Sequence, residues 1–155
     1  MLTKVERDEI IALIRQEVTP AIGCTEPIAV ALAVARVKEL LTVIPEKLDI
    51  WLSANVLKNA MGVGIPGTGM SGLPIAIAMG ALVGRLEYGL EVLRDSTPDI
   101  VVEGKKLVDR GIINIHLKED IVEKLYIEVT ASAGPDTARV IISREHTRFS
   151  LIEKN

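Results

Sequence analysis

The segment from Ile28 to Leu41 constrains the fold more than any other part of this chain, because a helix over these residues carries Ala, Leu and Val on nearly every face. Such a helix must be deeply buried, since it has no polar face to turn toward water. Residues Pro74 to Leu82 have the same character and predict a second buried helix, whose pattern continues with interruptions at Gly84 and Gly89. With 155 residues, of which 48% are hydrophobic, the chain can build one compact domain around these helices without a disulfide or a metal.

Capping signals place the amino-terminal helices. Thr3 and Glu6 have the spacing of a capping box and predict a first helix that ends before Pro20. Thr25 is the expected cap of the buried helix that follows, and Glu26 suits its first turn.

The second half of the chain changes from helix to strand. Thr97 is the expected cap of a helix from Pro98 through Val108, and Gly111 is well placed to stop it. A short strand from Leu48 to Ala54 precedes this region and leads into a helical turn from Asn55 to Ala60. Three later strands are predicted by aliphatic or alternating runs bounded by turn residues, over Ile112 to Leu117, Leu125 to Thr130 and Ala138 to Ser143.

This order of elements predicts the fold class. Helices come first and an expected antiparallel sheet afterwards, with one earlier strand between helices, which favours a mixed α/β (α+β) domain of two layers. We therefore expect residues 1–155 to form a single two-layer domain in which buried helices pack on a mainly antiparallel sheet.

Composition excludes several classes of partner. Only 3% of the residues are aromatic, so nucleotide bases would find few rings to stack on. The net charge is −3, with 18 basic and 21 acidic residues spread along the chain, so no basic stripe can neutralise phosphates or anionic lipid. We expect no nucleic-acid or membrane partner, and small molecules or proteins instead. A single cysteine and a charged amino terminus predict a cytoplasmic protein.

The only thiol lies in the run Gly23-Cys24-Thr25-Glu26-Pro27, just before a predicted helix. Unpaired amides and the helix dipole can stabilise a thiolate there, which predicts a lowered pKa for Cys24. Glu26 would oppose the thiolate if its carboxylate turned toward the sulfur. From this spacing alone, an ordinary buried structural cysteine is the favoured interpretation.

A second candidate segment runs from Lys58 to Gly72 and is rich in glycine, so its backbone can fold tightly with amides turned inward. It matches neither a phosphate loop nor a dinucleotide fingerprint cleanly. A small anion such as an amino-acid carboxylate could sit at the start of the following helix, beside Thr68, Ser71 or Lys58. A glycine-rich turn that packs helix against sheet is an equally good interpretation.

The two histidines do not have the spacing of metal ligands. His116 lies in a strand-like run, and His146 lies in a polar segment near the carboxy terminus. With one cysteine and two distant histidines, the chain cannot by itself supply a four-ligand zinc site or an all-cysteine iron–sulfur site.

The two motifs, over Glu17 to Ala29 and Lys58 to Gly72, resemble signatures of the L-cysteine desulfidase family, which is related to the iron–sulfur L-serine dehydratases. That family consists of longer chains, and the resemblance covers the amino-terminal portion over nearly all of this sequence. It implies an α,β-elimination that converts L-cysteine to pyruvate, ammonia and sulfide. It also implies a 4Fe-4S cluster held by three cysteines of the carboxy-terminal part.

In the family picture the cysteine that corresponds to Cys24 is the base that removes the α-proton of the substrate. Carried over to this sequence, Cys24 is the expected catalytic residue. The positions expected to bind a small amino-acid substrate share membership of the two motifs and are Thr25, Lys58, Asn59, Gly67, Thr68 and Gly69.

The chain departs from the family pattern because Cys24 is its only cysteine, so the ligands of the 4Fe-4S cluster are not in this chain. We expect it to be inactive alone and to work with a carboxy-terminal iron–sulfur domain or subunit. An excised domain, a natural fragment and one subunit of a split enzyme all fit, and the preferred amino acid stays open. A domain separated from a larger protein should leave part of its interface uncovered, which predicts an exposed apolar patch. Such a patch could also drive the chain to form a homo-oligomer.

Three functions compete at this point. A catalytic domain that contributes Cys24 to a shared site predicts that the two motifs meet in space. A non-catalytic domain for amino-acid binding or assembly, in a serine dehydratase-like protein, predicts that serine can replace Cys24 harmlessly. A stand-alone thiol hydrolase is the weakest of the three, because it needs His116 or His146 within reach of Cys24.

Overall fold

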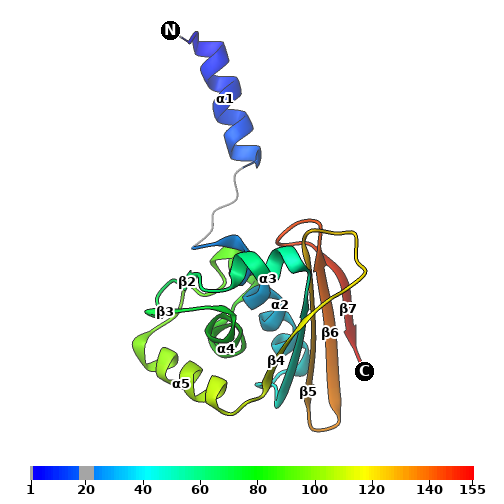
Figure 1. Ribbon diagram of the computed structural model, residues 1–155. Coiled ribbons are helices and arrows are strands. Elements are labelled where there is room, and N and C mark those ends of the chain that lie inside the picture. Colours follow the sequence, from blue (N-terminus) through cyan, green and yellow to red (C-terminus); the bar gives the residue numbers. More distant parts are fainter. Residues whose placement is uncertain (1, 18–22) are drawn as a thin grey trace.

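The long apolar helix is the centre of the computed structural model, which describes residues 2–17 and 23–155 (Figure 1). This helix, α2 (Thr25–Leu41), is buried from Pro27 through Ala35 and again at Val37 and Leu41, as its sequence predicts. It packs on the sheet through strands β5 (Tyr126–Ala133) and β6 (Asp136–Ser143), and on helix α4 (Leu73–Val83). The two apolar helices therefore cover one another.

A glycine sets the distance between α2 and α4. A Cβ added at Gly80 would lie 2.6 Å from the carbonyl oxygen of Ala31, which no side chain at this position can accommodate without a shift of the backbone. The close approach allows small side chains to fill the space between the helices at the density of a protein interior.

The remaining elements surround this pair. They are α1 (Lys4–Glu17), β1 (Lys47–Leu52), α3 (Ala54–Ala60), β2 (Gly64–Ile65), β3 (Met70–Ser71), the 3₁₀ helix η1 (Leu86–Glu91), α5 (Pro98–Asp109), β4 (Ile113–Leu117) and β7 (Phe149–Lys154).

The main sheet has five strands in the order β4-β1-β5-β6-β7. Strands β1 and β4 are parallel, and the other neighbours are antiparallel. Strands β2 and β3 form a separate antiparallel hairpin. Helix α5 packs on α4, so the helices gather on one side of the sheet in Figure 1. The chain is thus an α+β protein with a mostly antiparallel sheet, as predicted.

Alternation along β1 separates the two faces of the sheet. Leu48, Ile50 and Leu52 are completely buried, and the residues between them, Asp49 and Trp51, lie on the other face and are only partly buried. This pattern is that of an antiparallel sheet with one face on the core and one toward water.

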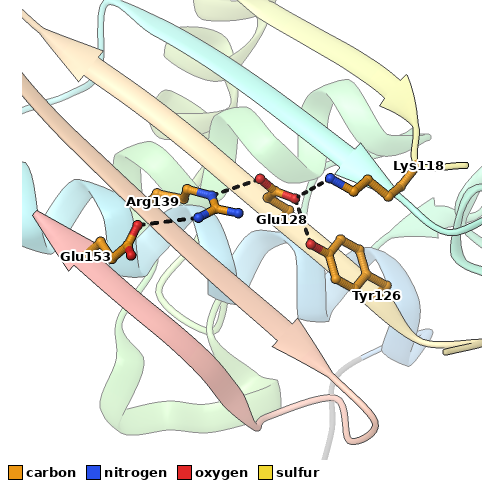
Figure 2. Close-up of polar contacts among 5 residues, drawn as sticks. All are labelled: Lys118, Tyr126, Glu128, Arg139 and Glu153. Atoms are coloured by element: carbon orange, nitrogen blue, oxygen red, sulfur yellow. Dashed lines mark hydrogen bonds and ion pairs between the residues drawn. The ribbon is translucent and has the colours of Figure 1, made fainter. Parts of the chain in front are cut away.

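The outer face carries a network of charges around Glu128, shown in Figure 2. The Glu128 carboxylate accepts hydrogen bonds from Lys118 Nζ at 3.1 Å, Tyr126 Oη at 2.7 Å and Arg139 Nε at 2.9 Å. Arg139 also donates to Glu153 at 3.4 Å. Burial raises the pKa of Glu128, but these three donors outweigh burial and leave the pKa below its ordinary value. Burial and the adjacent carboxylate raise the pKa of Tyr126 to about 12.

Several boundaries differ from the sequence predictions. The predicted cap Thr25 is wrong, because Cys24 is the N-cap residue and Thr25 is the first residue of α2. The glycine-rich segment contains the β2–β3 hairpin rather than only a loop. Strand β7 was not predicted at all, since FSLIEK mixes polar and apolar residues without a turn signal after it.

Helix α1 begins as predicted, with the Glu6 carboxylate accepting hydrogen bonds from the Thr3 amide at 2.8 Å and from its hydroxyl at 2.9 Å. In Figure 1 this helix extends away from the other elements. Its apolar side chains Ile10, Leu13 and Ile14 are 43%, 57% and 52% exposed. An exposed apolar surface was expected, and α1 supplies it. In the part of the chain that the structure describes, no helix has both the length and the apolar character needed to cross a membrane.

Candidate active site around Cys24

Cys24 lies at the amino-terminal end of α2, in an extended backbone conformation, and is half-buried. Its side chain makes no capping hydrogen bond to the helix amides. The thiol instead donates a hydrogen bond to Glu26 Oε2 at 3.1 Å. Glu26 belongs to the first turn of the helix, so its side chain turns back toward the cap position.

The pKa of Cys24 is raised, which corrects the lowered value predicted from the helix start. Burial is the largest cause, and the Glu26 carboxylate adds to it because a negative charge beside the sulfur disfavours the thiolate. The resting state of the pair is therefore a neutral thiol that donates to a carboxylate.

Glu26 is held in its ionised form. Burial raises its pKa, but hydrogen bonds from Cys24 and from the Thr25 hydroxyl, the latter at 3.2 Å, together with the nearby imidazole of His146, bring the pKa below its ordinary value. His146 Nε2 lies 3.8 Å from Glu26 Oε1. The two oxygens of one carboxylate thus face a thiol and an imidazole.

His146 comes from the turn between β6 and β7, which lies at the same end of the molecule as the start of α2 in Figure 1. Backbone hydrogen bonds shape this turn, including one from the Arg144 amide to the Leu125 carbonyl at 3.2 Å. An open pocket of about 620 Å³ adjoins the cluster and is lined by Gln16, Thr25, Leu90, Arg144, Glu145, His146 and Thr147. The pocket reaches the cluster through His146 and through Thr25, the residue next to Cys24.

The order of the three groups is Cys24, Glu26, His146. A cysteine hydrolase needs the imidazole between the nucleophile and the carboxylate, so that the histidine takes the proton of the thiol. Here the carboxylate stands in the middle. His116 is also placed elsewhere, since it stacks on Trp51 with ring centroids 4.2 Å apart and its Nε2 lies 3.0 Å from Asp49 Oδ1 on the outer face of the sheet.

The two motifs meet through Gly23, the residue before Cys24. Gly23 has a φ of +87°, and a Cβ added there would lie 2.6 Å from Pro66 Cγ. The glycine-rich segment therefore packs directly against the backbone beside the thiol, and α3 contacts α2 on the same side of the sheet. This contact is what the shared-site hypothesis requires. Residues 18–22 of the first motif lie outside the described residues.

The residues predicted to bind substrate have different environments. Lys58 and Asn59 are exposed on α3, and Gly67 and Gly69 are exposed in the turn of the β2–β3 hairpin. Thr68 is buried, and its hydroxyl is used within this turn. It donates to the Ile65 carbonyl at 2.7 Å and accepts from the Met70 amide at 3.0 Å. The side chain of Thr68 therefore shapes the hairpin, while the exposed positions are open to a ligand.

The described residues contain no group of side chains suited to hold an iron–sulfur cluster. Among the residues that the structure describes, no three His, Cys, Asp or Glu side chains are grouped so that they could hold a metal ion. Cys24 is the only cysteine of the whole sequence and is hydrogen-bonded to a carboxylate.

Comparison with known proteins shows similarity to a set of longer chains. The chain is 65% identical over 99% of its length to a UPF0597 protein of Bacteroides fragilis, and 64% identical over its full length to a UPF0597 protein of Phocaeicola vulgatus. It is 45% identical over 98% of its length to a UPF0597 protein of Aeromonas hydrophila. This chain spans only 36%, 36% and 34% of these three relatives, or about a third of their length. No family model and no solved structure matches the chain.

The sequence located the thiol, the glycine-rich segment and the conditional effect of Glu26 on the thiolate. A position two residues away does not reveal whether a side chain turns back, and the structure shows that the Glu26 carboxylate does so. His146 lies in a different part of the sequence, and only the fold of the β6–β7 turn brings it to Glu26.

Proposed function

We propose that this chain is the amino-terminal catalytic part of an L-cysteine desulfidase-like lyase, which eliminates sulfide from L-cysteine to give pyruvate and ammonia. The contact that carries this proposal is the cluster of Cys24, Glu26 and His146, in which the thiol lies 3.1 Å from a group that can take its proton. Of these three residues, His146 lines an open pocket. The resemblance of both motifs to the desulfidase signatures supports it, as does the packing of Gly23 on Pro66.

The part assigned to this chain is removal of the substrate's α-proton. A thiolate at Cys24 would take this proton from the carbon next to the carboxylate, and the thiol form seen in the structure is the product of that step. The exposed motif positions Lys58, Asn59, Gly67 and Gly69 and the partly buried Thr25 are proposed to hold the amino acid. Thr68 is proposed to shape the turn that presents Gly67 and Gly69.

A 4Fe-4S cluster is proposed to belong to the remaining part of the longer protein, because this sequence has one cysteine and its described residues hold no group of three possible metal ligands. The exposed apolar face of α1 is proposed as a place where that part docks, or where a second copy of the chain docks. A single thiol without a disulfide partner agrees with a cytoplasmic enzyme.

The test joins this chain to the part of the Bacteroides fragilis relative that it does not cover, with the cluster reconstituted. L-cysteine is supplied, and pyruvate and sulfide are measured. We expect the joined protein to produce both in equal amounts, and this chain alone to produce neither. Cys24→Ser should abolish production.

A matched variant separates loss of the thiol from damage to the fold. His116→Gln removes a side chain whose Nε2 lies 3.0 Å from Asp49 Oδ1 on the outer face of the sheet. This variant should leave turnover within about twofold. Full activity of Cys24→Ser, with unchanged amino-acid binding by calorimetry, would contradict the proposal and support a non-catalytic binding domain instead.

A further inference from the structure

The neutral thiol of Cys24 poses a problem for a residue proposed to act as a base. Its hydrogen bond to Glu26 Oε2 shows where the proton of the thiol points. After each removal of an α-proton the residue would return to this protonated form. The proton must then leave before the next turnover, and the neighbours of the sulfur decide its route.

Glu26 and His146 follow the thiol in series. One carboxylate oxygen of Glu26 accepts from the thiol, and the other lies 3.8 Å from His146 Nε2. The side chains are 18% exposed for Glu26 and 35% exposed for His146, so access to water increases along the series. A distance of 3.8 Å is longer than a hydrogen bond, and such contacts commonly shorten when a substrate is bound.

Resting on the function proposed above, we propose that Glu26 takes the proton from Cys24 and that His146 passes it to solvent. In the first step the S–H bond breaks and an O–H bond forms at Oε2, leaving a thiolate and a neutral carboxyl group. After the carboxyl group turns, this proton moves to His146 Nε2, which leaves a carboxylate and an imidazolium. Water then removes the proton from His146, and the total charge is unchanged until that point.

The surroundings of His146 contain few other charges. Glu26 faces it from α2, and Arg144 and Glu145 of its own turn line the same pocket. Gln16 of α1 and Leu90 of η1, which carry no charge, complete the lining among the described residues. Arg144 and Glu145 are of opposite sign, and the same turn also contains Arg148, whose amide donates to the Glu145 carbonyl at 3.1 Å.

The first arm of the test uses this chain and does not depend on turnover. Alkylation of Cys24 by iodoacetamide is followed as a function of pH for the wild type, Glu26→Gln and His146→Gln. Glu26→Gln should react faster and titrate at lower pH, because the charge that opposes the thiolate is gone. His146→Gln should react more slowly only at pH values where the imidazole is protonated.

The matched control is His116→Gln, which removes the histidine of a second histidine–carboxylate pair, at 3.0 Å from Asp49, that has no thiol. Its alkylation profile should coincide with that of the wild type at every pH. An unchanged profile for Glu26→Gln, or equal changes in the two histidine variants, would overturn the proposal.

The second arm measures turnover of L-cysteine in the joined protein. Glu26→Gln should lower kcat by about 100-fold or more with little change in KM, although its thiol is more reactive. Glu26→Asp should restore part of the rate. A kcat of Glu26→Gln at or above that of the wild type would show that Glu26 only holds the thiol. If the wild-type joined protein produces neither pyruvate nor sulfide, the proposed function fails, and the alkylation arm alone decides whether the three groups are coupled.

Discussion

At the scale of single residues, the backbone before the thiol is as specific as the thiol itself. Gly23 has a φ of +87°, in the region that favours glycine, and Pro66 occupies the place of a side chain. Both conditions result from the packing of the glycine-rich segment on the start of α2. The position of Cys24 therefore depends on a residue without a side chain.

Gly23→Ala should accordingly destabilise the protein more than an alanine at another left-handed glycine. Gly62 has a φ of +74° with no atom within 4 Å of an added Cβ, so Gly62→Ala measures the backbone cost alone, about 1–2 kcal/mol. Gly23→Ala also displaces Pro66, so it should lower the free energy of unfolding by about 1–3 kcal/mol more than Gly62→Ala does. Urea denaturation of the two variants measures the difference, and equal losses of stability would show that Pro66 moves without cost.

At the scale of elements, the Glu128 network ties strands β4, β5, β6 and β7 together on the outer face of the sheet (Figure 2). Glu128 is only 6% exposed, so its charge is compensated by neighbouring donors rather than by water. Its contribution to stability should depend on pH.

The folded-state pKa of Glu128 lies below its ordinary value, so the unfolded chain binds more protons at acidic pH. The stabilisation is therefore present above about pH 4.5 and is lost as the pH falls through the lowered value. Glu128→Gln should lower the free energy of unfolding by about 1–3 kcal/mol at pH 7. On acidification the variant should lose less stability than the wild type does. Glu153→Gln is the control, because its side chain is 55% exposed and joins only the end of the network. A Glu128→Gln variant with the same acid dependence as the wild type would refute this assignment.

The same scale shows why part of the structure could be predicted from the sequence. Helices α2 and α4 follow from their unbroken apolar composition, and α5 from the Thr97 cap, whose hydroxyl accepts from the Ile100 amide at 3.3 Å. The parallel pairing of β1 with β4 did not follow, since it depends on a contact between distant segments. Strand β7 did not follow because its sequence mixes polar and apolar residues, although it pairs with the neighbouring strand β6.

The candidate site also has features that the sequence predicts and features that it does not. A lone cysteine before a helix is visible in one sequence, but the direction of the Glu26 side chain is decided by packing, and this direction reversed the expected pKa shift of Cys24. The approach of His146 depends on the β6–β7 turn, whose second strand had no sequence signal.

At the scale of the whole molecule, the chain has its own core and yet exposes the apolar face of α1. It covers about a third of the relatives to which it is similar, 36% in the case of the Bacteroides fragilis protein. A face of this kind is typical of a surface that another part of a protein covers.

Leu13→Lys on α1 should therefore weaken the association between this chain and the separately produced remainder of the Bacteroides fragilis relative by about tenfold or more. The reason is that a charge replaces an apolar side chain that the docked remainder would bury. Val122→Lys is the matched control, since Val122 is 96% exposed but lies in the loop between β4 and β5. Association is measured by light scattering after mixing. Equal affinities of the two variants would place the docking surface elsewhere than α1.

The parallel contact between β1 and β4 has a consequence for how the sheet is assembled. These strands are neighbours in space, but residues 53–112, with three helices, the hairpin and η1, lie between them in the chain. Pairing them closes a long loop, and the entropy lost in that closure must be offset by contacts made inside the loop. The strands β5, β6 and β7 pair through short turns and carry no such cost. The segment that presents the glycine-rich hairpin to Cys24 is therefore also the segment whose folding allows the edge strand β4 to join the sheet.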